Sequence, residues 1–246
     1  MQLIFDRIFI RILKLIKVCA SLMLPNYMLI RKRRNFAGLY PAKEMQNLKI
    51  NGFEQIHDHH FSFYNSKADV NSTKLRNYYI LHYANLALKY DKSGILLFCG
   101  VSYGVTVRIL AEMLYNKFPN LSMYLVDPLD GRTPWKTLAY NTNPKLVTDL
   151  INPDIKLNFF LEPLAPKFVT DIPGTLQFIV LNTTDYSAEV EALPLLIEKM
   201  TDSAILIIEL FGFFSIEQQE NINRVLVELN TVFFELPTMQ LVVHKS

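Results

Sequence analysis

Two glycines are spaced along the chain in a way that suits a nucleotide-like ligand. Gly100 and Gly104 enclose a short turn between an apolar run, Ile95–Phe98, and a segment whose apolar residues recur at helical spacing. In a strand, glycine turn and helix unit, the backbone can approach a ligand closely. The first N–H groups of the helix then point into the crevice at the carboxyl end of the strand. The turn predicts a nucleotide-like ligand, and the alternative is a tight turn that binds nothing.

An acidic residue follows the next apolar run. Asp127 closes the run Leu121–Val126 and lies 27 residues after Gly100. In nucleotide-binding α/β folds an acid at this place accepts hydrogen bonds from the two ribose hydroxyls, because its strand neighbours the glycine strand. The interval therefore favours ribose binding by Asp127. A turn or helix-capping aspartate before Pro128 is the alternative.

The rest of the chain alternates between strand and helix patterns. We expect helices from Ser72 to Tyr90, after Gly104, and around 138–151, 188–200 and 216–229, with strands at 95–98, 121–126, 155–160, 176–181, 204–208, 232–236 and 240–244. The last two strands lie around Pro237-Thr238 and read as an antiparallel hairpin. The pattern predicts an α/β fold with a seven-stranded, mostly parallel, Rossmann-like sheet and a C-terminal antiparallel hairpin.

These features together resemble the class I S-adenosylmethionine-dependent methyltransferases over about residues 72–246, and among them the macrocin O-methyltransferase type. The glycine motif of that type, roughly E-x-G-V-x-x-G-x-S/T, is followed from Phe98 to Thr106, except that Phe98 replaces the acid. Its second strand ends in D-S-F-E-G, which Asp127–Gly131 matches loosely. The resemblance implies S-adenosylmethionine as cofactor. It also implies a set of cofactor-binding residues: Gly100, Ser102, Tyr103, Gly104, Asp127 and Asn182.

The same family binds a divalent metal through motifs that are eroded here. Its D-G-D-L-Y-E-S-T motif corresponds to Asn182–Glu189, and its later pair of aspartates corresponds to Glu209-Leu210. A hard cation wants oxygen ligands with at least one or two carboxylates, so a divalent metal stays open as a second cofactor. Without it, a base acts alone or the reaction relies on proximity. The candidate catalytic residues are Glu209, Asp185 and His82, and a helix cap is the alternative for Glu209.

The N-terminal segment is basic, whereas the body is acidic. Residues 1–34 have a net charge of +7, and the remaining residues have −5. Arg7, Arg11, Lys14 and Lys17 share one face of a helix predicted from Leu3 to Leu24, and Arg31–Arg34 follow. We expect residues 1–34 to bind an anionic membrane surface peripherally, on the cytoplasmic side. Packing on the body or on a second subunit is the alternative, and a homo-oligomer stays open.

Residues 35–71 are expected to form a lid or connecting segment before the methyltransferase-like domain at 72–246. They include Ile56-His57-Asp58-His59-His60, which we interpret as a surface loop or substrate-facing lid rather than a metal site. The two cysteines, Cys19 and Cys99, provide no disulfide framework, which favours a reducing compartment.

Three functions compete. The first is an O-methyltransferase acting on a sugar or another small hydroxylated acceptor, including one carried on a lipid. The second is a catalytically degenerate methyltransferase-fold protein with a binding or regulatory role, which the change at Phe98 would explain. The third is a nucleotide-dependent oxidoreductase, which the terminal hairpin disfavours. Nucleic acid is not expected as a partner, because the acidic body has no basic stripe with interleaved aromatic residues.

Overall fold

The computed structural model consists of two compact units, Met1–Ile50 and Asn51–Ser246. The described residues are 27–32, 36–41, 50–62, 70–90, 94–101, 104–127, 155–183, 185–212, 216–236 and 238–245. The predicted helix Leu3–Leu24 and the predicted helix around 138–151 lie outside them, as do Ser102 and Tyr103. Among the described residues, no helix combines the length and apolar character needed to cross a bilayer.

The first unit contains an antiparallel pair of strands, β1 (Tyr27–Lys32) and β2 (Phe36–Pro41), which is in register from Tyr27 opposite Pro41 to Lys32 opposite Phe36. The sequence interpretation missed this hairpin. It placed 27–32 in the basic segment that follows the predicted helix, without a strand, and 36–41 in a lid or connecting segment. The predicted lid at 35–71 is divided between the units, because the second unit begins at Asn51.

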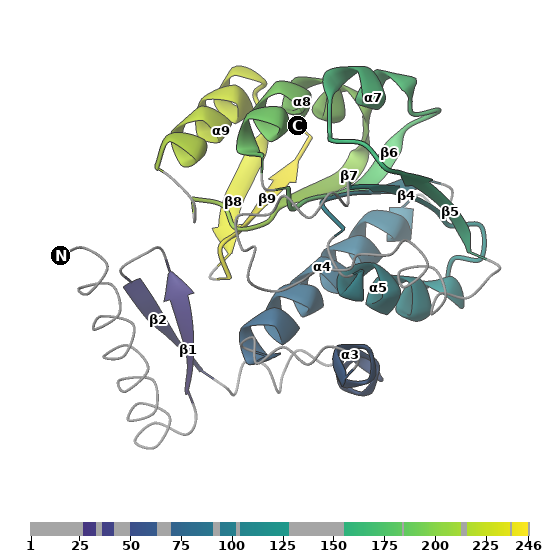
Figure 1. Ribbon diagram of the computed structural model, residues 1–246, viewed down its shortest axis with the longest axis vertical. Coiled ribbons are helices and arrows are strands. Elements are labelled where there is room, and N and C mark those ends of the chain that lie inside the picture. The colour runs from purple at the N-terminus through teal and green to yellow at the C-terminus, as the bar shows by residue number, and fades with distance from the viewer. Residues whose placement is uncertain are drawn as a thin grey trace. The chain divides into compact units, whose positions relative to one another are not determined.

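A seven-stranded sheet forms the centre of the second unit (Figure 1). Its strands lie in the order β5-β4-β3-β6-β7-β9-β8. They span Ile95–Cys99 (β3), Ser122–Val126 (β4), Lys156–Phe160 (β5), Leu176–Leu181 (β6), Met200–Ile208 (β7), Val232–Leu236 (β8) and Gln240–His244 (β9). All neighbouring pairs are parallel except those of β9, which runs antiparallel to both β7 and β8. The predicted fold is confirmed, with β9 inserted between β7 and the edge strand β8.

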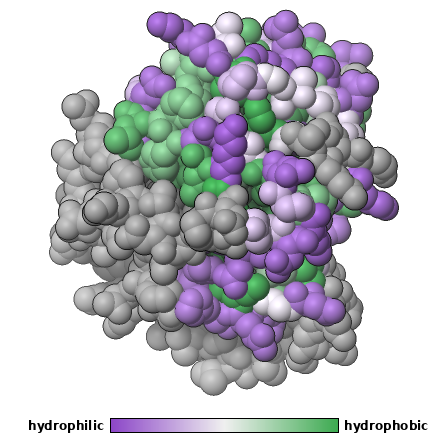
Figure 2. Space-filling model, turned by 90° about the vertical axis from the view of Figure 1, so that its right-hand side faces the viewer, coloured by the Kyte–Doolittle hydropathy of each residue, from purple (hydrophilic) through white to green (hydrophobic). Residues whose placement is uncertain are grey.

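Helices cover both faces of this sheet (Figure 1). One face carries α4 (Val70–Tyr90) and α5 (Val105–Tyr115), and α3 (Phe53–Ser62) packs against these two helices. The other carries α7 (Pro166–Asp171), α8 (Tyr186–Lys199) and α9 (Ile216–Glu228). Burial on both faces explains why the central strands are mainly apolar. Every residue of β6 is buried, including Gln177, whose amide donates to Ala87 O. On the β5 side of the molecule, hydrophobic residues appear in small groups among hydrophilic ones (Figure 2).

The histidine cluster belongs to a helix and not to a surface loop, so that prediction is wrong. His57 and His60 lie three residues apart on α3 and are both buried. His60 Nε2 lies 2.8 Å from Glu112 Oε2 on α5, and burial lowers the pKa of His60. The cluster therefore joins α3 to α5. Across the residues with described side chains, no three His, Cys, Asp or Glu residues gather closely enough to hold a metal ion.

Candidate functional site

Gly100 lies where the carboxyl ends of three parallel strands meet. Its N–H donates to Val126 O at 2.8 Å, and Asn182 N–H donates to Cys99 O at 2.8 Å. Gly100 has φ +81°, and a Cβ on it would lie 2.1 Å from the Asn182 carbonyl oxygen. Only glycine fits, because the ends of β3 and β6 approach each other so closely. The backbone at Gly100, where the glycine turn begins, is thus fixed by the sheet itself.

Gly104 sets the start of α5. It is the N-cap residue with φ 71°, and no side chain among the described residues caps the helix. Its N–H donates to Val101 O at 2.9 Å, which closes the turn. The first N–H groups of a helix have no partner within the helix, so an uncapped start beside a tight turn is suited to an anionic or polar ligand.

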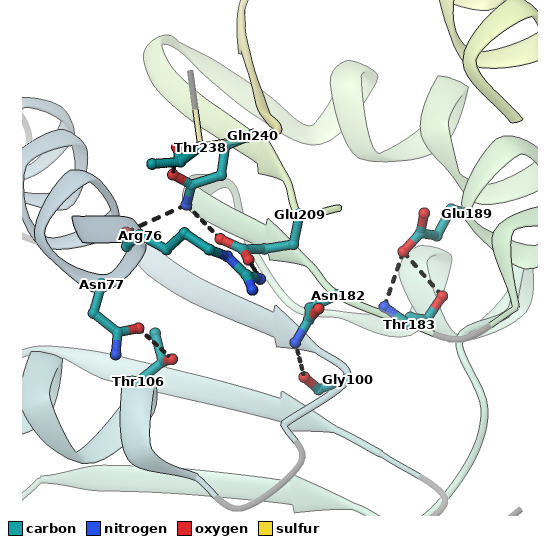
Figure 3. Close-up of polar contacts among 10 residues, drawn as sticks. All are labelled: Arg76, Asn77, Gly100, Thr106, Asn182, Thr183, Glu189, Glu209, Thr238 and Gln240. Atoms are coloured by element: carbon teal, nitrogen blue, oxygen red, sulfur yellow. Dashed lines mark hydrogen bonds and ion pairs between the residues drawn. The ribbon is translucent and has the colours of Figure 1, made fainter. Parts of the chain in front are cut away.

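Asp127 and Asn182 lie on either side of Gly100. Asp127 follows β4 and Asn182 follows β6, which are the two strands paired with β3. The N–H of Asp127 donates to Phe160 O at 3.1 Å, and its side chain is half-buried. Asn182 Nδ2 donates to Gly100 O at 3.5 Å (Figure 3). The structure thus brings three of the predicted cofactor-binding residues side by side at one edge.

Glu209 continues this row at the end of β7. Its N–H donates to Leu181 O at 2.7 Å, and only 5% of the residue is exposed. Its carboxylate forms an ion pair with Nη2 of Arg76 from α4 and accepts a hydrogen bond from Gln240 Nε2 of β9 (Figure 3). Both carboxylate oxygens are therefore engaged, which suits a positioning role better than proton transfer. The sequence did not reveal Arg76 or Gln240, since their contacts link distant segments.

Asp185 is the N-cap of α8. Its Oδ1 accepts hydrogen bonds from Ser187 N at 3.1 Å, Ala188 N at 3.3 Å and Ser187 Oγ at 2.5 Å. The hydrogen bond from the Ser187 side chain, with those from the helix N–H groups, holds the pKa of Asp185 below its usual range. An exposed capping carboxylate with a lowered pKa is a poor general base.

His82 is not brought to this row of residues. It lies exposed on α4, 6.5 Å from the Tyr78 ring in a stacked arrangement, and partial burial lowers its pKa. With Lys117 and Phe118 it lines an open hollow of about 550 Å³. These two residues follow the C-terminal end of α5, whereas Gly104 precedes its start. An 11-residue helix is about 16 Å long, so His82 lies toward the opposite edge of the sheet.

The metal motif carried over from the family does not fit these residues. Of the oxygen donors expected to contribute, Glu209 is paired with Arg76 and Asp185 caps α8. Mg²⁺ demands near-ideal octahedral geometry and is usually bound through one or two carboxylates, whose oxygens must be open to it. Neither carboxylate meets that requirement in this arrangement.

A buried carboxyl group that the sequence interpretation missed is hydrogen-bonded to the residue after Asn182. Glu189 on α8 is 2% exposed, and its Oε1 accepts hydrogen bonds from Thr183 N and Thr183 Oγ1, both at 2.9 Å (Figure 3). Burial raises the pKa of Glu189 to about 7. The thiol of Cys99 is also buried, which raises its pKa far above the usual range and makes it unreactive.

Solved structures share this fold at low sequence identity. No protein-family model matches the chain, and neither does any curated protein. The O-methyltransferase NovP aligns with a TM-score of 0.55 and 12% identity, over 70% of this chain and 79% of its own. The S-adenosylhomocysteine-bound methyltransferase PaMTH1 from Podospora anserina aligns with a TM-score of 0.53 and 9% identity, over 83% of this chain and 95% of its own. A proposed rRNA methylase from Clostridium thermocellum aligns with a TM-score of 0.50 and 17% identity, over 70% of this chain and 93% of its own. The chain therefore has the Rossmann-like fold found in solved methyltransferases.

Proposed function

We propose that the chain is an S-adenosylmethionine-dependent methyltransferase. The observation that carries the proposal is the row formed by Asp127, Gly100 and Asn182 at the carboxyl ends of β4, β3 and β6, beside the uncapped start of α5. Ligands of open α/β sheets bind at this end of the strands. The likeness to PaMTH1, a structure with bound S-adenosylhomocysteine, supports the same cofactor here.

These residues fit the cofactor group by group. The half-buried carboxylate of Asp127 would accept hydrogen bonds from the ribose hydroxyls. The backbone of the turn from Gly100 to Gly104, with Ser102 and Tyr103 as proposed further contacts, would line the methionine part. Asn182 would border it from β6. When bound, the cofactor supplies a methyl group on a cationic sulfur.

We assign the acceptor to small hydroxylated molecules, with sugars and lipid-carried sugars as the first candidates. The likeness to NovP, which is an O-methyltransferase, supports this class. Since Glu209 and Asp185 are engaged in structural contacts, the chain would act mainly by orienting the acceptor oxygen toward the methyl group and excluding water. RNA is a weaker candidate, because residues 35–246 have a net charge of −5.

A second candidate function is cofactor or ligand binding without turnover. The engaged carboxylates of Glu209 and Asp185 favour it, because neither is poised to accept a proton. Turnover with radiolabelled S-adenosylmethionine and a panel of hydroxylated acceptors separates the two functions, as binding without label transfer to any acceptor would favour this one.

Isothermal titration calorimetry with S-adenosylmethionine and S-adenosylhomocysteine tests the proposal. We expect saturable binding of both at a 1:1 ratio, with NADH, which has ribose and phosphates but no methionine part, as the control ligand. Absence of heat for both methionine-derived ligands would overturn the methyltransferase assignment. Binding of NADH alone would favour an oxidoreductase instead.

A further inference from the structure

An ion pair between Arg76 and Glu209 lies at the carboxyl end of β7. Glu209 is almost fully buried, and 23% of the Arg76 side chain is exposed. Burial lowers the pKa of Arg76 to about 10, so the guanidinium remains cationic at neutral pH. Removing two charges from water generally costs as much as their attraction returns. A pair kept at the carboxyl ends of the strands therefore points to a binding role.

Polar groups from two other elements hold this pair in place. Gln240 Nε2 contacts Glu209 Oε1 and lies 3.3 Å from the Arg76 carbonyl oxygen, and Gln240 Oε1 accepts a hydrogen bond from Thr238 Oγ1 at 2.5 Å. Gln240 and Thr238 are themselves buried. The charged groups are thus pre-oriented, which reduces the entropy lost when a ligand binds them.

Two side-chain donors of α4 are still open. Arg76 Nε and Asn77 Nδ2 are buried, and neither has a hydrogen-bond partner within the described part of the chain. Thr106 Oγ1 donates to Asn77 Oδ1 at 2.7 Å, which fixes the orientation of the amide (Figure 3). Buried donors are normally satisfied, so Arg76 Nε, which belongs to the ion pair, indicates that a ligand supplies an acceptor oxygen here. A carboxylate suits a guanidinium especially well.

We propose that Arg76 and Glu209 bind the amino-acid end of the cofactor. Arg76 receives the α-carboxylate, and Glu209 accepts a hydrogen bond from the α-ammonium group. This inference rests on the proposed function and assigns the site for one part of its cofactor.

The charge balance of the pair selects a zwitterion. Arg76 and Glu209 are together neutral, so a lone cation or a lone anion gains little net attraction from them. A zwitterion places its negative group on Arg76 and its positive group on Glu209, and each carboxylate oxygen has two lone pairs to share. At the carboxyl ends of the strands, the residues lie in the order Asp127, Gly100, Asn182 and Glu209, across three strand spacings or about 14 Å. The ribose would then lie at Asp127, the sulfur near Gly100 and Asn182, and the amino-acid end at Glu209.

The test compares two ligands that differ only at this end. S-adenosylhomocysteine carries the zwitterion, and 5′-methylthioadenosine lacks it. We expect the wild-type chain to bind S-adenosylhomocysteine at least about tenfold more tightly. In the double variant Arg76→Met/Glu209→Gln, which leaves no unpaired buried charge, S-adenosylhomocysteine affinity falls about 10- to 100-fold. Its affinity for 5′-methylthioadenosine stays within about twofold, because the adenosine part does not contact the pair.

The matched control is Lys89→Met, which removes a cation from the exposed far end of α4 and changes neither affinity. Thermal unfolding checks that each variant is folded. If the double variant does not fold, Arg76→Lys serves instead, since it keeps the charge and loses the planar fork. This variant should bind S-adenosylhomocysteine more weakly than the wild type does, with its affinity for 5′-methylthioadenosine unchanged.

Two outcomes would overturn the assignment of the subsite. One is an equal loss of affinity for both ligands, and the other is unchanged S-adenosylhomocysteine affinity in a folded variant. A wild-type chain that binds both ligands equally well also contradicts it while leaving the proposed function intact. A wild-type chain that binds neither overturns the function as well.

Discussion

At the scale of single residues, Gly100 meets two separate requirements. Its φ of +81° lies in the left-handed region, which side chains of L-residues rarely adopt, and its α-carbon lies against the Asn182 carbonyl group. Gly174 has nearly the same φ, +80°, but a Cβ there would meet only Ile95 Cδ1, at 3.8 Å. The two glycines therefore separate the cost of backbone conformation from the cost of close approach.

Gly174→Ala should destabilise the fold by about 1–2 kcal/mol, which is the cost of the backbone conformation alone. Gly100→Ala should cost at least about 3 kcal/mol, since β3 and β6 must also separate at their ends. Urea unfolding followed by circular dichroism measures both changes. Equal losses in the two variants would show that the contact with Asn182 is unimportant.

The proposed ribose site depends on Asp127. Asp127→Ala should weaken S-adenosylhomocysteine binding about 10- to 100-fold, because two hydrogen bonds to a charged group are lost. The control is Asp202→Ala, an exposed acid in the first half of β7. Calorimetry gives both affinities, and an Asp127→Ala variant that binds like the wild type would place the ribose elsewhere.

At the scale of elements, α8 supports the end of β6 through one buried carboxyl group. Glu189 accepts two hydrogen bonds from Thr183, the residue after Asn182. Burial raises the pKa of Glu189 from 4.5 to about 7. The folded chain therefore holds this proton more tightly than the unfolded chain. The stabilisation is fully present below pH 4.5 and is lost as the pH rises through 7.

Glu189→Gln should flatten this pH dependence. The amide keeps an acceptor for Thr183 but does not ionise. Between pH 4.5 and pH values above 7, the free energy of unfolding of the variant should therefore rise relative to that of the wild type, by up to about 3 kcal/mol. Chemical unfolding at several pH values measures the difference. The control is Glu191→Gln, at an exposed position on α8, whose free energy of unfolding should have the same pH dependence as that of the wild type. A pH-independent difference for Glu189→Gln would contradict the role of burial.

Elements with strong local signals could be predicted from the sequence. The continuous apolar runs predicted all seven strands of the main sheet, and Pro237-Thr238 predicted the hairpin. Four elements were missed: the strands β1 and β2, the helix α3, and the short, six-residue helix α7. In α3, the spacing of His57 and His60 was a helical signal that polar composition obscured.

The site could be predicted only where it follows from chain order. Gly100, Asp127 and Asn182 are neighbours because each follows a strand of the same parallel sheet. The contacts of Arg76 with Glu209, and of Glu189 with Thr183, depend on the packing of helices against strand ends, which no local spacing encodes. His82 was predicted to lie near the glycine turn because α4 precedes that turn in the sequence. The sequence does not show which end of α4 lies beside the turn, and His82 lies toward the other end.

At the scale of the whole molecule, charge divides the chain. Residues 1–34 have a net charge of +7, and the rest has −5. We propose that the basic segment brings the protein to an anionic, cytoplasm-facing membrane surface, where a lipid-carried acceptor would be close to the catalytic unit. The attraction is electrostatic, so it should weaken with salt.

Flotation with liposomes tests this membrane proposal. The full chain should float with vesicles that contain 30% phosphatidylserine, and floating should decrease at 0.5 M salt. A chain lacking residues 1–34 should remain at the bottom, and neutral phosphatidylcholine vesicles serve as the control. Equal flotation of both chains would remove the membrane role from this segment.

A crystal structure of the chain with S-adenosylhomocysteine is the measurement that tests the central claim most directly. The account predicts density along the carboxyl ends of β4, β3 and β6. The ribose hydroxyls should lie within hydrogen-bond distance of Asp127, and the sulfur should lie over the turn between Gly100 and Gly104. Ligand density at another place, or none at saturating concentration, would contradict it.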